Sequence, residues 1–504
     1  MRKIFACVLL LGLMYACQPA QENLEVRPEP PARSRQDLDK LIWDTVKEKG
    51  TFDWNAQSAE VVWSALTQSD EVMAIGYKPA QKNADLRLSI HHIDIREAEW
   101  QAARQAVLDL AFEEERRYHP DLKKEEMVVF EEAVLPVINL RVRHLRTVEQ
   151  LRASGFVRYA EPMAYEPALS QDKSSSGCGG YDPDFGLVAN VDFSNLSPNA
   201  KASWNHPFHS IAPTWTRTSG ANIRVMVIDT GVSFNQDNLG TQFNQGASSG
   251  RTLERIATLR EWRLFGSGPL ESPNDACGHG TAMAGVCVAP RGTDGNASGI
   301  AYNSSLVAVR AASDVFLDAS REVKGVSDAY VLAGNRSDIQ ITSMSLGRIT
   351  SSSQIADAIR YAYNRGKLIF CAGGTSFGWS AGWFGVIFPA TMSETVAVTG
   401  VKDNFSRCTE CHDGSAIDFV VVMERASDGR KPLTTATSGD QPGTVGGSSV
   451  ATAQTAGIAA LVWARNPFLT RDQVLNKLVT SASNYPSRSS NFGWGRINAD
   501  LATQ

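Results

Sequence analysis

A serine at the start of a long apolar segment is the first place in this sequence where chemistry is expected. Residues 446–453 read Gly-Gly-Ser-Ser-Val-Ala-Thr-Ala, and an apolar run with helical periodicity follows directly. On a glycine-rich turn at a helix start, a serine hydroxyl lies beside free backbone N–H groups and the positive end of the helix dipole. A nucleophile that faces a developing oxyanion needs this environment. The alternative is an ordinary helix start, with Ser448 or Ser449 as the N-cap.

An aspartate and a histidine precede this serine, each in a setting suited to catalysis. Asp229 ends the apolar run 223–228 and is followed by Thr and Gly, so it lies at the end of a predicted buried strand. Catalytic groups collect at such strand ends in α/β sheets, although Asp-x-Gly also caps ordinary turns. His279 begins the segment 279–286, whose small residues at helical spacing predict a tightly packed helix. The glycines on both sides of His279 leave room for a partner.

The elements that must position these residues alternate between strands and helices. Strands are predicted over 222–229, 305–310, 339–346, 367–372, 395–401 and 419–422, and helices over 211–216, 279–286, 355–366 and 449–462. This alternation is typical of an α/β fold with a doubly wound, mostly parallel sheet.

Four short motifs in this segment resemble those of one protein family. They are Asp229-Thr230-Gly231, His279-Gly280-Thr281-x-x-Ala284-Gly285, Ser345-Leu346-Gly347 and Gly447-Ser448-Ser449-x-Ala451. In these motifs, and in the chain order Asp, His, Ser, residues 205–504 resemble the peptidase domain of subtilisin-like serine proteases. The resemblance implies the subtilisin-like fold and peptide-bond hydrolysis.

The resemblance also assigns a role to each matching residue. Ser449 is expected to be the nucleophile, His279 the general base and later the acid, and Asp229 the residue that orients the imidazole. The Ser-Leu-Gly motif is expected to pair with the backbone of an extended polypeptide substrate by β-augmentation. The reaction is expected to proceed through an acyl-enzyme, without a metal or cofactor. A structural calcium is compatible with the family, but no residues are assigned to it.

One departure from the family pattern concerns the oxyanion. After the strand 368–370, the family usually reads Ala-Gly-Asn, and the Asn side chain donates to the oxyanion; here Gly374 and Thr375 stand in this region. Loss of one such donor costs about 10²–10³ in turnover, roughly 2.7–4 kcal/mol. The Ser449 N–H remains, and Thr375 or a water molecule is available as a substitute. A Gly374→Asn variant is expected to gain turnover unless another donor already fills the position.

Residues 81–167 predict a small α+β unit. Strands over 86–93, 126–132, 135–142 and 156–162, with helices over 97–118 and 147–154, give the order β-α-β-β-α-β of the ferredoxin-like fold. The unit resembles the propeptides of subtilisin-like proteases, in which the last strand leads into the active site and is cut there. The resemblance implies a self-inhibited precursor whose propeptide is its own partner. Autocleavage is expected in or near 165–174, where the linker 168–204 begins.

The first residues predict export. A basic start and the apolar run 4–16 form a secretory signal peptide, too short to span a bilayer. Residues 13–17 resemble the lipobox of bacterial lipoproteins, so Cys17 is expected to be lipidated and to anchor the protein to a membrane, in the periplasm or at the cell surface of a bacterium. The alternative is a plain signal peptide that ends near Ala16. Residues 18–80 are predicted to form a polar, Pro-rich tether and a helical hairpin.

Composition and cysteine count restrict the remaining classes. The net charge of −5 shows no excess of basic residues of the kind that binds nucleic acid. With 8 cysteines among 504 residues, the chain is not a disulfide scaffold. The CxxC pair at 408–411 fits a zinc half-site, a redox pair or a small disulfide. Cys277 could pair with Cys178 or with one of the CxxC cysteines. Cys287 and Cys371 lie in apolar runs and are predicted to be buried thiols.

Three functions compete for this sequence. The leading hypothesis is an exported, lipid-anchored serine endopeptidase made as a self-inhibited precursor. The rival is a binding lipoprotein that holds peptides but barely cuts them, a hypothesis motivated by Gly374. An esterase that uses the same triad has no further supporting feature. The complete Asp-His-Ser set favours the protease, because a pure binder needs none of these three groups.

Overall fold

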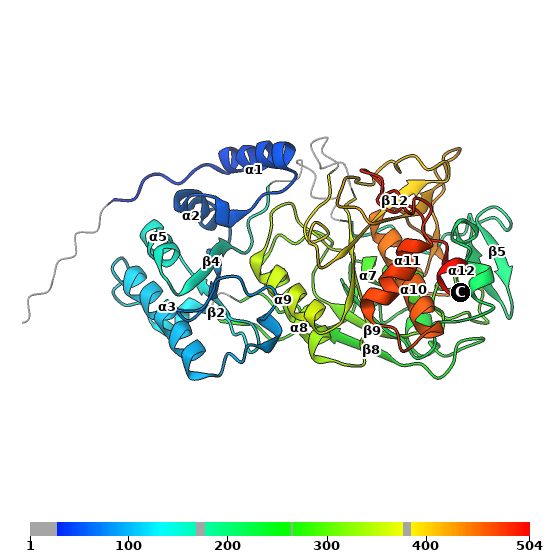
Figure 1. Cartoon of the computed structure of the whole chain (residues 1–504), viewed down its shortest axis with the longest axis horizontal. Coiled ribbons are helices and arrows are strands. Elements are labelled where there is room, and N and C mark those ends of the chain that lie inside the picture. The colour runs from blue at the N-terminus through cyan, green and yellow to red at the C-terminus, as the bar shows by residue number, and fades with distance from the viewer. Residues whose placement is uncertain (1–27, 168–176, 264–265, 376–384) are drawn as a thin grey trace, which may run out of the picture.

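A sheet of seven parallel strands organises the C-terminal part of the molecule. The computed structural model describes residues 28–167, 177–263, 266–375 and 385–504. The strand order is β13-β12-β11-β10-β7-β9-β8 (Figure 1). The strands are β7 (Arg224–Asp229), β8 (Leu253–Ala257), β9 (Ser305–Arg310), β10 (Ile341–Met344), β11 (Leu368–Ala372), β12 (Val396–Lys402) and β13 (Phe419–Glu424). The predicted α/β fold with a parallel sheet is confirmed, and β8 is a strand that the sequence analysis did not identify.

Helices cover both faces of this sheet. Alternate residues of β7 point to opposite faces: Val225 and Val227 pack with one apolar cluster, and Met226 and Ile228 with another. The first cluster includes side chains of α7 (His279–Val288), α10 (Gly447–Arg465) and α11 (Arg471–Thr480). The second includes side chains of α8 (Ser320–Asn335) and α9 (Ser353–Asn364). The near-continuous apolar sequences of the strands follow from this double burial.

The sheet changes direction between β7 and β10. From β7 the chain moves to β8 and β9 on one side, and then returns to β10 through β13 on the other. In open α/β sheets, ligands bind beyond the carboxyl ends of the strands at such a switch point. Asp229 ends β7, and Ser345 directly follows β10. The fold therefore brings two of the predicted site motifs to this point.

A small antiparallel α+β unit precedes the parallel sheet. Its strands are ordered β2-β3-β1-β4, the arrangement of a ferredoxin-like β-α-β-β-α-β unit. The elements are β1 (Val72–Tyr77), α3 (Ala98–Arg116), α4 (Lys124–Met127), β2 (Val128–Phe130), β3 (Val137–Arg141), α5 (Leu145–Ala153) and β4 (Val157–Pro162). The predicted order of elements is confirmed, with a different first strand.

The strand predicted over 86–93 is wrong. Leu86 and Ile90 are buried and lie one turn apart, with the N–H of Ile90 donating to the Leu86 carbonyl at 2.8 Å, and Ile90–His92 forms a 3-10 helix. The true first strand, β1, is buried along its whole length, so its sequence lacks the alternation that identifies a half-exposed strand. The unit thus includes residues before 81, where the sequence analysis placed its start.

The predicted helical hairpin is confirmed upstream of β1. It consists of α1 (Arg35–Lys49) and α2 (Ala59–Thr67), whose apolar faces are buried. The hydroxyl of Ser34 caps the start of α1, and Gly50 ends it with a left-handed backbone. Because α2 packs against α5 and β4, the hairpin is part of the N-terminal unit rather than a separate spacer.

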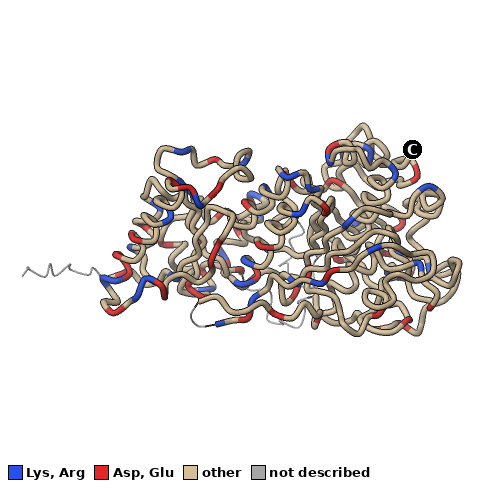
Figure 2. The backbone as a smooth tube through the Cα atoms, turned by 90° about the horizontal axis from the view of Figure 1, so that it is seen from below, with Lys and Arg blue, Asp and Glu red and all other residues tan. Residues whose placement is uncertain are grey.

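The N-terminal unit packs against α8 and α9, and one apolar cluster runs across the contact (Figure 1). A buried ion pair joins Arg158 on β4 to Asp357 on α9, with 2.6 Å between Nη2 and Oδ2. The side chain of Asn139 on β3 donates to that of Gln354 at 2.7 Å. Basic and acidic residues are interspersed along the backbone of the N-terminal unit and of the part that contains the parallel sheet (Figure 2). The contact therefore combines a continuous apolar core with buried polar pairs.

The predicted signal peptide and Cys17 lie in residues 1–27, outside the described residues, as do residues 168–176 of the linker. Across the ranges that the structure covers, we find no helix both long enough and apolar enough to cross a membrane.

Candidate active site

Asp229 and His279 form a buried pair at the carboxyl end of the parallel sheet. Asp229 Oδ1 lies 2.6 Å from His279 Nδ1, and both residues are 1% exposed. A carboxylate oxygen only accepts, so Nδ1 carries the proton and Nε2 presents its lone pair. Nε2 is buried and has no hydrogen-bond partner among the described residues. This tautomer is the one that a general base needs.

A second buried carboxylate, Asp275, orders the loop before His279. Its two oxygens accept from the N–H groups of Cys277, Gly278 and Thr281 at 2.8–3.0 Å, and from the hydroxyls of Thr230 and Thr281. The carboxylate thus binds the free N–H groups at the start of α7 and ties them to the residue after Asp229. The sequence analysis missed this residue. An Asp four positions before a helix of small residues is a helix-start signal that could have identified it.

Ser449 lies in the first turn of α10. Gly446 is the N-cap of this helix and makes no side-chain capping bond, so the alternative that Ser448 or Ser449 is the N-cap is wrong. Ser449 is 7% exposed, and α10 packs against α7, the helix that begins with His279. The hydroxyl of Ser345 donates to the Ser449 carbonyl at 3.0 Å. The predicted nucleophile thus adjoins the predicted substrate strand.

Gly374 and Thr375, the predicted oxyanion region, bond to Ser448, the residue before the predicted nucleophile. The Gly374 N–H donates to the Ser448 hydroxyl at 3.1 Å, and the Ser448 N–H donates to the Thr375 hydroxyl at 3.0 Å. The two hydroxyl oxygens are 2.8 Å apart. One hydroxyl hydrogen lies between these two oxygens, so the other hydroxyl hydrogen remains to donate elsewhere. The site therefore holds a spare neutral donor next to Ser449.

The position of an Asn side chain at residue 374 is filled by His412. A Cβ atom on Gly374 would lie 2.5 Å from Nδ1 of His412, and the φ of Gly374 is +127°. The imidazole is held by its own bond, since Nδ1 lies 2.8 Å from the Gly385 carbonyl. Burial lowers the pKa of His412 to about 4, so the ring is neutral near pH 7. The expectation that Gly374→Asn gains turnover therefore does not fit the geometry.

Of the predicted substrate strand, Ser345 and Leu346 are buried, and Gly347 is already paired. The Gly347 N–H donates to the Val315 carbonyl at 3.2 Å, and its carbonyl accepts from the Leu317 N–H at 3.0 Å. An extended peptide that paired with Gly347 would have to replace these two bonds. In this structure the segment 315–317 thus occupies the edge that β-augmentation would use.

Glu166 reaches the residues that follow this edge. Its carboxylate accepts from Arg348 Nε at 2.9 Å and from the Ile349 N–H at 2.8 Å, and Arg348 is fully buried. Arg348 also donates to the Met163 carbonyl at 2.9 Å. The end of the N-terminal unit is therefore bound directly beyond Gly347. This ion pair was not identified from the sequence.

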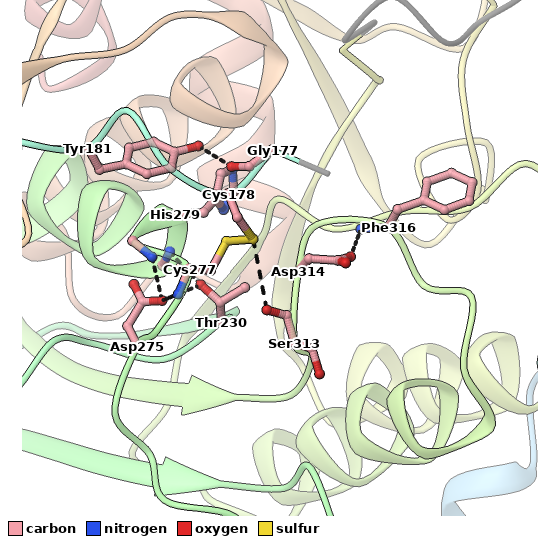
Figure 3. The surroundings of a disulfide bond; sticks show 12 residues. Gly177, Cys178, Tyr181, Thr230, Asp275, Cys277, His279, Ser313, Asp314 and Phe316 are labelled. Atoms are coloured by element: carbon pink, nitrogen blue, oxygen red, sulfur yellow. Dashed lines mark hydrogen bonds between the residues drawn. A yellow bond between two sulfur atoms is a disulfide. The ribbon is translucent and has the colours of Figure 1, made fainter. Parts of the chain in front are cut away.

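The six cysteines among the described residues form two disulfides and two buried thiols. Cys178 pairs with Cys277 (Figure 3). Cys408 pairs with Cys411, so the zinc half-site interpretation is wrong. The thiols of Cys287 and Cys371 are buried as predicted, and burial raises the pKa of each to about 12. The part of the chain that the structure describes contains no group of three or more His, Cys, Asp or Glu residues suited to a metal ion.

A protein-family model matches the part of the chain that holds this site. The model of the subtilase family matches residues 220–495, more than half of the chain. The matched segment contains Asp229, His279 and Ser449, together with the strands and helices that hold them.

Individual relatives align with a little more than half of the chain. Subtilisin DY of Bacillus licheniformis is 31% identical over 287 residues, which cover 56% of this chain and 92% of that protein. Alkaline elastase YaB of Bacillus sp. (strain YaB) is 29% identical over 288 residues, 57% of this chain and 66% of that protein. The chain spans slightly less than two thirds of the latter's length. Among solved structures, MycP1 with its N-terminal propeptide removed matches with a TM-score of 0.47 and 20% identity, over 60% of this chain and 97% of that one.

Proposed function

The chain belongs to the subtilase family, and we propose that it is a serine endopeptidase that hydrolyses polypeptides through an acyl-enzyme on Ser449. The observation that carries this proposal is the buried pair of Asp229 and His279, whose Nδ1–H tautomer leaves the Nε2 lone pair for a proton. A protein that only bound peptides would have no use for a desolvated imidazole held in this state.

The proposed reaction assigns one task to each of these residues. Ser449 Oγ attacks the scissile carbonyl carbon while its proton passes to His279 Nε2. Asp229 stabilises the imidazolium that results, and His279 then protonates the leaving amine. A water molecule loses its proton to His279 and attacks the acyl-enzyme, which releases the new carboxylate and restores the Ser449 hydroxyl.

Two kinds of hydrogen-bond donor would stabilise the developing oxyanion. The backbone N–H of Ser449 lies at the positive end of α10. The second donor is the hydroxyl hydrogen that the Thr375–Ser448 pair does not use internally. This donor replaces the amide that other members of the family place at the position of Gly374.

The rival function, peptide binding with little cleavage, draws on two observations. His412 fills the place of the missing Asn side chain, and Gly347 is already paired with the segment 315–317. A fluorophosphonate probe separates the two functions, because it reacts only with an activated serine. We expect labelling in the chain freed of its N-terminal unit and none in Ser449→Ala. Absence of labelling in folded material that binds peptides would favour the rival.

We also propose that the N-terminal unit inhibits the precursor. Support comes from its buried contacts: Arg158 pairs with Asp357, and Glu166 bonds the backbone just beyond the predicted substrate strand. Cleavage in or near residues 165–174 would release the inhibitor.

Processing is tested with the Ser449→Ala chain. If the protease cuts its own linker, the wild type yields a new N-terminus near residues 165–174, whereas Ser449→Ala stays intact. Cleavage of Ser449→Ala when active enzyme is added would indicate processing between molecules. An intact wild-type chain with full activity would overturn the precursor proposal.

Export and anchoring form a separate proposal. The basic start, the apolar run 4–16 and Cys17 support a lipoprotein signal. We expect the mature protein to begin with a lipidated Cys17 and to fractionate with membranes, and Cys17→Ser to abolish this anchoring. Mass spectrometry that finds an unmodified Cys17 in the mature protein would overturn the proposal.

A further inference from the structure

The short segment 177–181 lies against the loop that carries His279 (Figure 3). The Cys178–Cys277 disulfide joins the two, although the cysteines are 99 positions apart in the chain. The N–H of Gly179 adds a bond to the Cys277 carbonyl at 3.1 Å. Cys277 is two residues before His279, and its own N–H is bound by Asp275. The disulfide thus anchors this segment to the same loop that Asp275 orders.

The ring of Tyr181 is the part of this segment that meets the imidazole. The two rings are nearly perpendicular, with an interplanar angle of 83° and 5.9 Å between centroids. This edge-to-face arrangement is a favourable geometry for aromatic rings. Tyr181 is 6% exposed, so the ring also excludes water from this side of His279. Gly278 allows the approach: a Cβ there would lie 2.8 Å from Tyr181 Cδ2.

Besides the disulfide, the segment 177–181 is held by the packing of Tyr181 in the apolar cluster that includes α7 and by a small number of hydrogen bonds. Gly177, Gly179 and Gly180 all adopt positive φ, and a glycine-rich stretch loses more conformational freedom on ordering than any other. Two bonds hold Tyr181 itself: its hydroxyl donates to the Gly177 carbonyl at 2.7 Å, and its carbonyl accepts from the Thr437 N–H at 2.9 Å. The first of these bonds is internal to the segment, so it does not fix the segment to the rest of the molecule.

We propose that Tyr181 is a positioning residue for His279, and that the Cys178–Cys277 disulfide is required to hold it there. The ring limits rotation of the imidazole away from Asp229 and from Ser449, so it acts through His279 and does not touch the substrate. This role rests on the proposed function, because Tyr181 acts on the histidine of the same triad. Full activity then requires that the Cys178–Cys277 disulfide be oxidised.

Reduction by a small dithiol tests the dependence on the disulfide. Two electrons and two protons pass from the dithiol to the disulfide, which gives two protein thiols and a cyclic disulfide of the reagent. We expect kcat of the wild type to fall about tenfold with KM changed less than twofold. A displaced imidazole reduces the stabilisation of the transition state but leaves substrate binding unchanged. The Cys178→Ser/Cys277→Ser variant should show the same low kcat before treatment. Any further loss of kcat when that variant is reduced would be due to reduction of the Cys408–Cys411 disulfide.

Substitutions at Tyr181 test the ring itself. Tyr181→Phe keeps the ring and should retain kcat within about twofold. Tyr181→Leu keeps an apolar group without the aromatic edge and should lower kcat about tenfold, again with little change in KM. Tyr485→Leu, at a half-exposed ring outside the site, is the matched control and should leave both constants unchanged. Equal kcat in Tyr181→Phe and Tyr181→Leu would overturn the role of the ring.

A readout that needs no turnover separates this proposal from the proposed function. In the Ser449→Ala chain, the Nδ1–H proton shared with Asp229 should give a low-field NMR signal that His279→Ala removes. We expect the signal to broaden by exchange with water after reduction, in Cys178→Ser/Cys277→Ser and in Tyr181→Leu, but not in Tyr181→Phe. A sharp signal in the folded, reduced protein would overturn the proposal even if the enzyme proved inactive. Loss of kcat with this pattern of broadening supports it.

Discussion

On the side of His279, buried carboxylates organise the site, whereas on the side of Gly374 neutral hydroxyls and an imidazole do so. Asp229 accepts a hydrogen bond from the imidazole of His279. Asp275 accepts hydrogen bonds from backbone N–H groups of the loop and helix start that carry His279. Opposite them, within the part of the chain that the structure describes, the hydroxyls of Ser448 and Thr375 bond to each other and to backbone N–H groups. Hydrogen bonds to charged groups are about twice as strong as neutral ones. Charged hydrogen bonds therefore hold the side of His279, whereas neutral and weaker hydrogen bonds hold the side that is proposed to receive the oxyanion.

The largest effect is expected on the carboxylate side. Asp229→Asn keeps the shape but can donate to Nδ1, so it favours the tautomer with its proton on Nε2. We expect kcat to fall about 10⁴-fold while KM stays close to the wild-type value, because such a change removes the base without removing the site. Steady-state kinetics on a peptide substrate measure this effect. Asp229→Glu serves as the control that keeps the charge.

A loss of less than about tenfold in Asp229→Asn would contradict the assignment of Asp229. It would mean that the imidazole is oriented by other contacts, such as the Tyr181 ring and the loop that Asp275 orders. The double change Asp229→Asn/Tyr181→Leu would then show whether the ring supplies that orientation.

The next effect is expected at the hydroxyl pair. Thr375→Val or Ser448→Ala removes one hydroxyl and leaves the other with a hydrogen that no longer has the partner hydroxyl as its acceptor, so this hydrogen can still serve the oxyanion. Each single variant should therefore lose little kcat, whereas the double variant should lose about 10²–10³ if the spare hydrogen serves the oxyanion, the amount typical of one such group. Because the two residues share one spare hydrogen, their losses should be far from additive in the double variant. Additive losses would show that the hydroxyls act independently.

The carboxylate side was easier to predict from the sequence than the oxyanion side. Asp229, His279 and Ser449 stand in contiguous motifs, and each motif sits at an element boundary that apolar periodicity reveals. Gly374 was found as a departure from a pattern, but its consequence depends on His412, 38 positions later, which the fold returns to it. No local signal predicts that contact. The same holds for Tyr181, which reaches His279 through a long-range disulfide.

In the N-terminal unit, errors in the predicted strands have a physical cause. β1 is buried on both faces and reads as a plain apolar run, so its period could not be distinguished. Residues 86–93 alternate in sequence, yet Leu86 and Ile90 pack together in a helical turn. The helices α3 and α5 were found because each is half-exposed and shows its period clearly.

A moderate effect is expected when Asn is restored at Gly374. The new Cβ would meet the His412 ring, and the backbone there has a φ of +127°. We expect Gly374→Asn to lower the free energy of unfolding by about 1–3 kcal/mol, as overpacking does, without raising kcat. Combining it with His412→Gly makes room for the side chain and should recover part of the lost stability. A gain in kcat in the single variant would show that His412 moves aside easily.

An effect of similar size, but spread over an interval of pH, is expected from His412. Burial lowers the pKa of this imidazole from 6.5 to about 4 in the folded protein, so folding favours its neutral form. The stability that results is complete above pH 6.5 and is lost as the pH falls through about 4. The wild type should therefore lose on the order of 1–3 kcal/mol of unfolding free energy over this interval through His412. Urea unfolding at several pH values measures it.

His412→Asn isolates this contribution, because an Asn amide can still donate to the Gly385 carbonyl but does not titrate. The fully buried His206 and His209, whose pKa values burial lowers to about 3, are common to both proteins, so their contributions cancel in the difference. The variant should be less stable than the wild type at pH 7 and should approach it as the pH falls toward 4. Parallel curves would show that His412 does not remain buried, and with it the explanation for glycine at position 374 would fail.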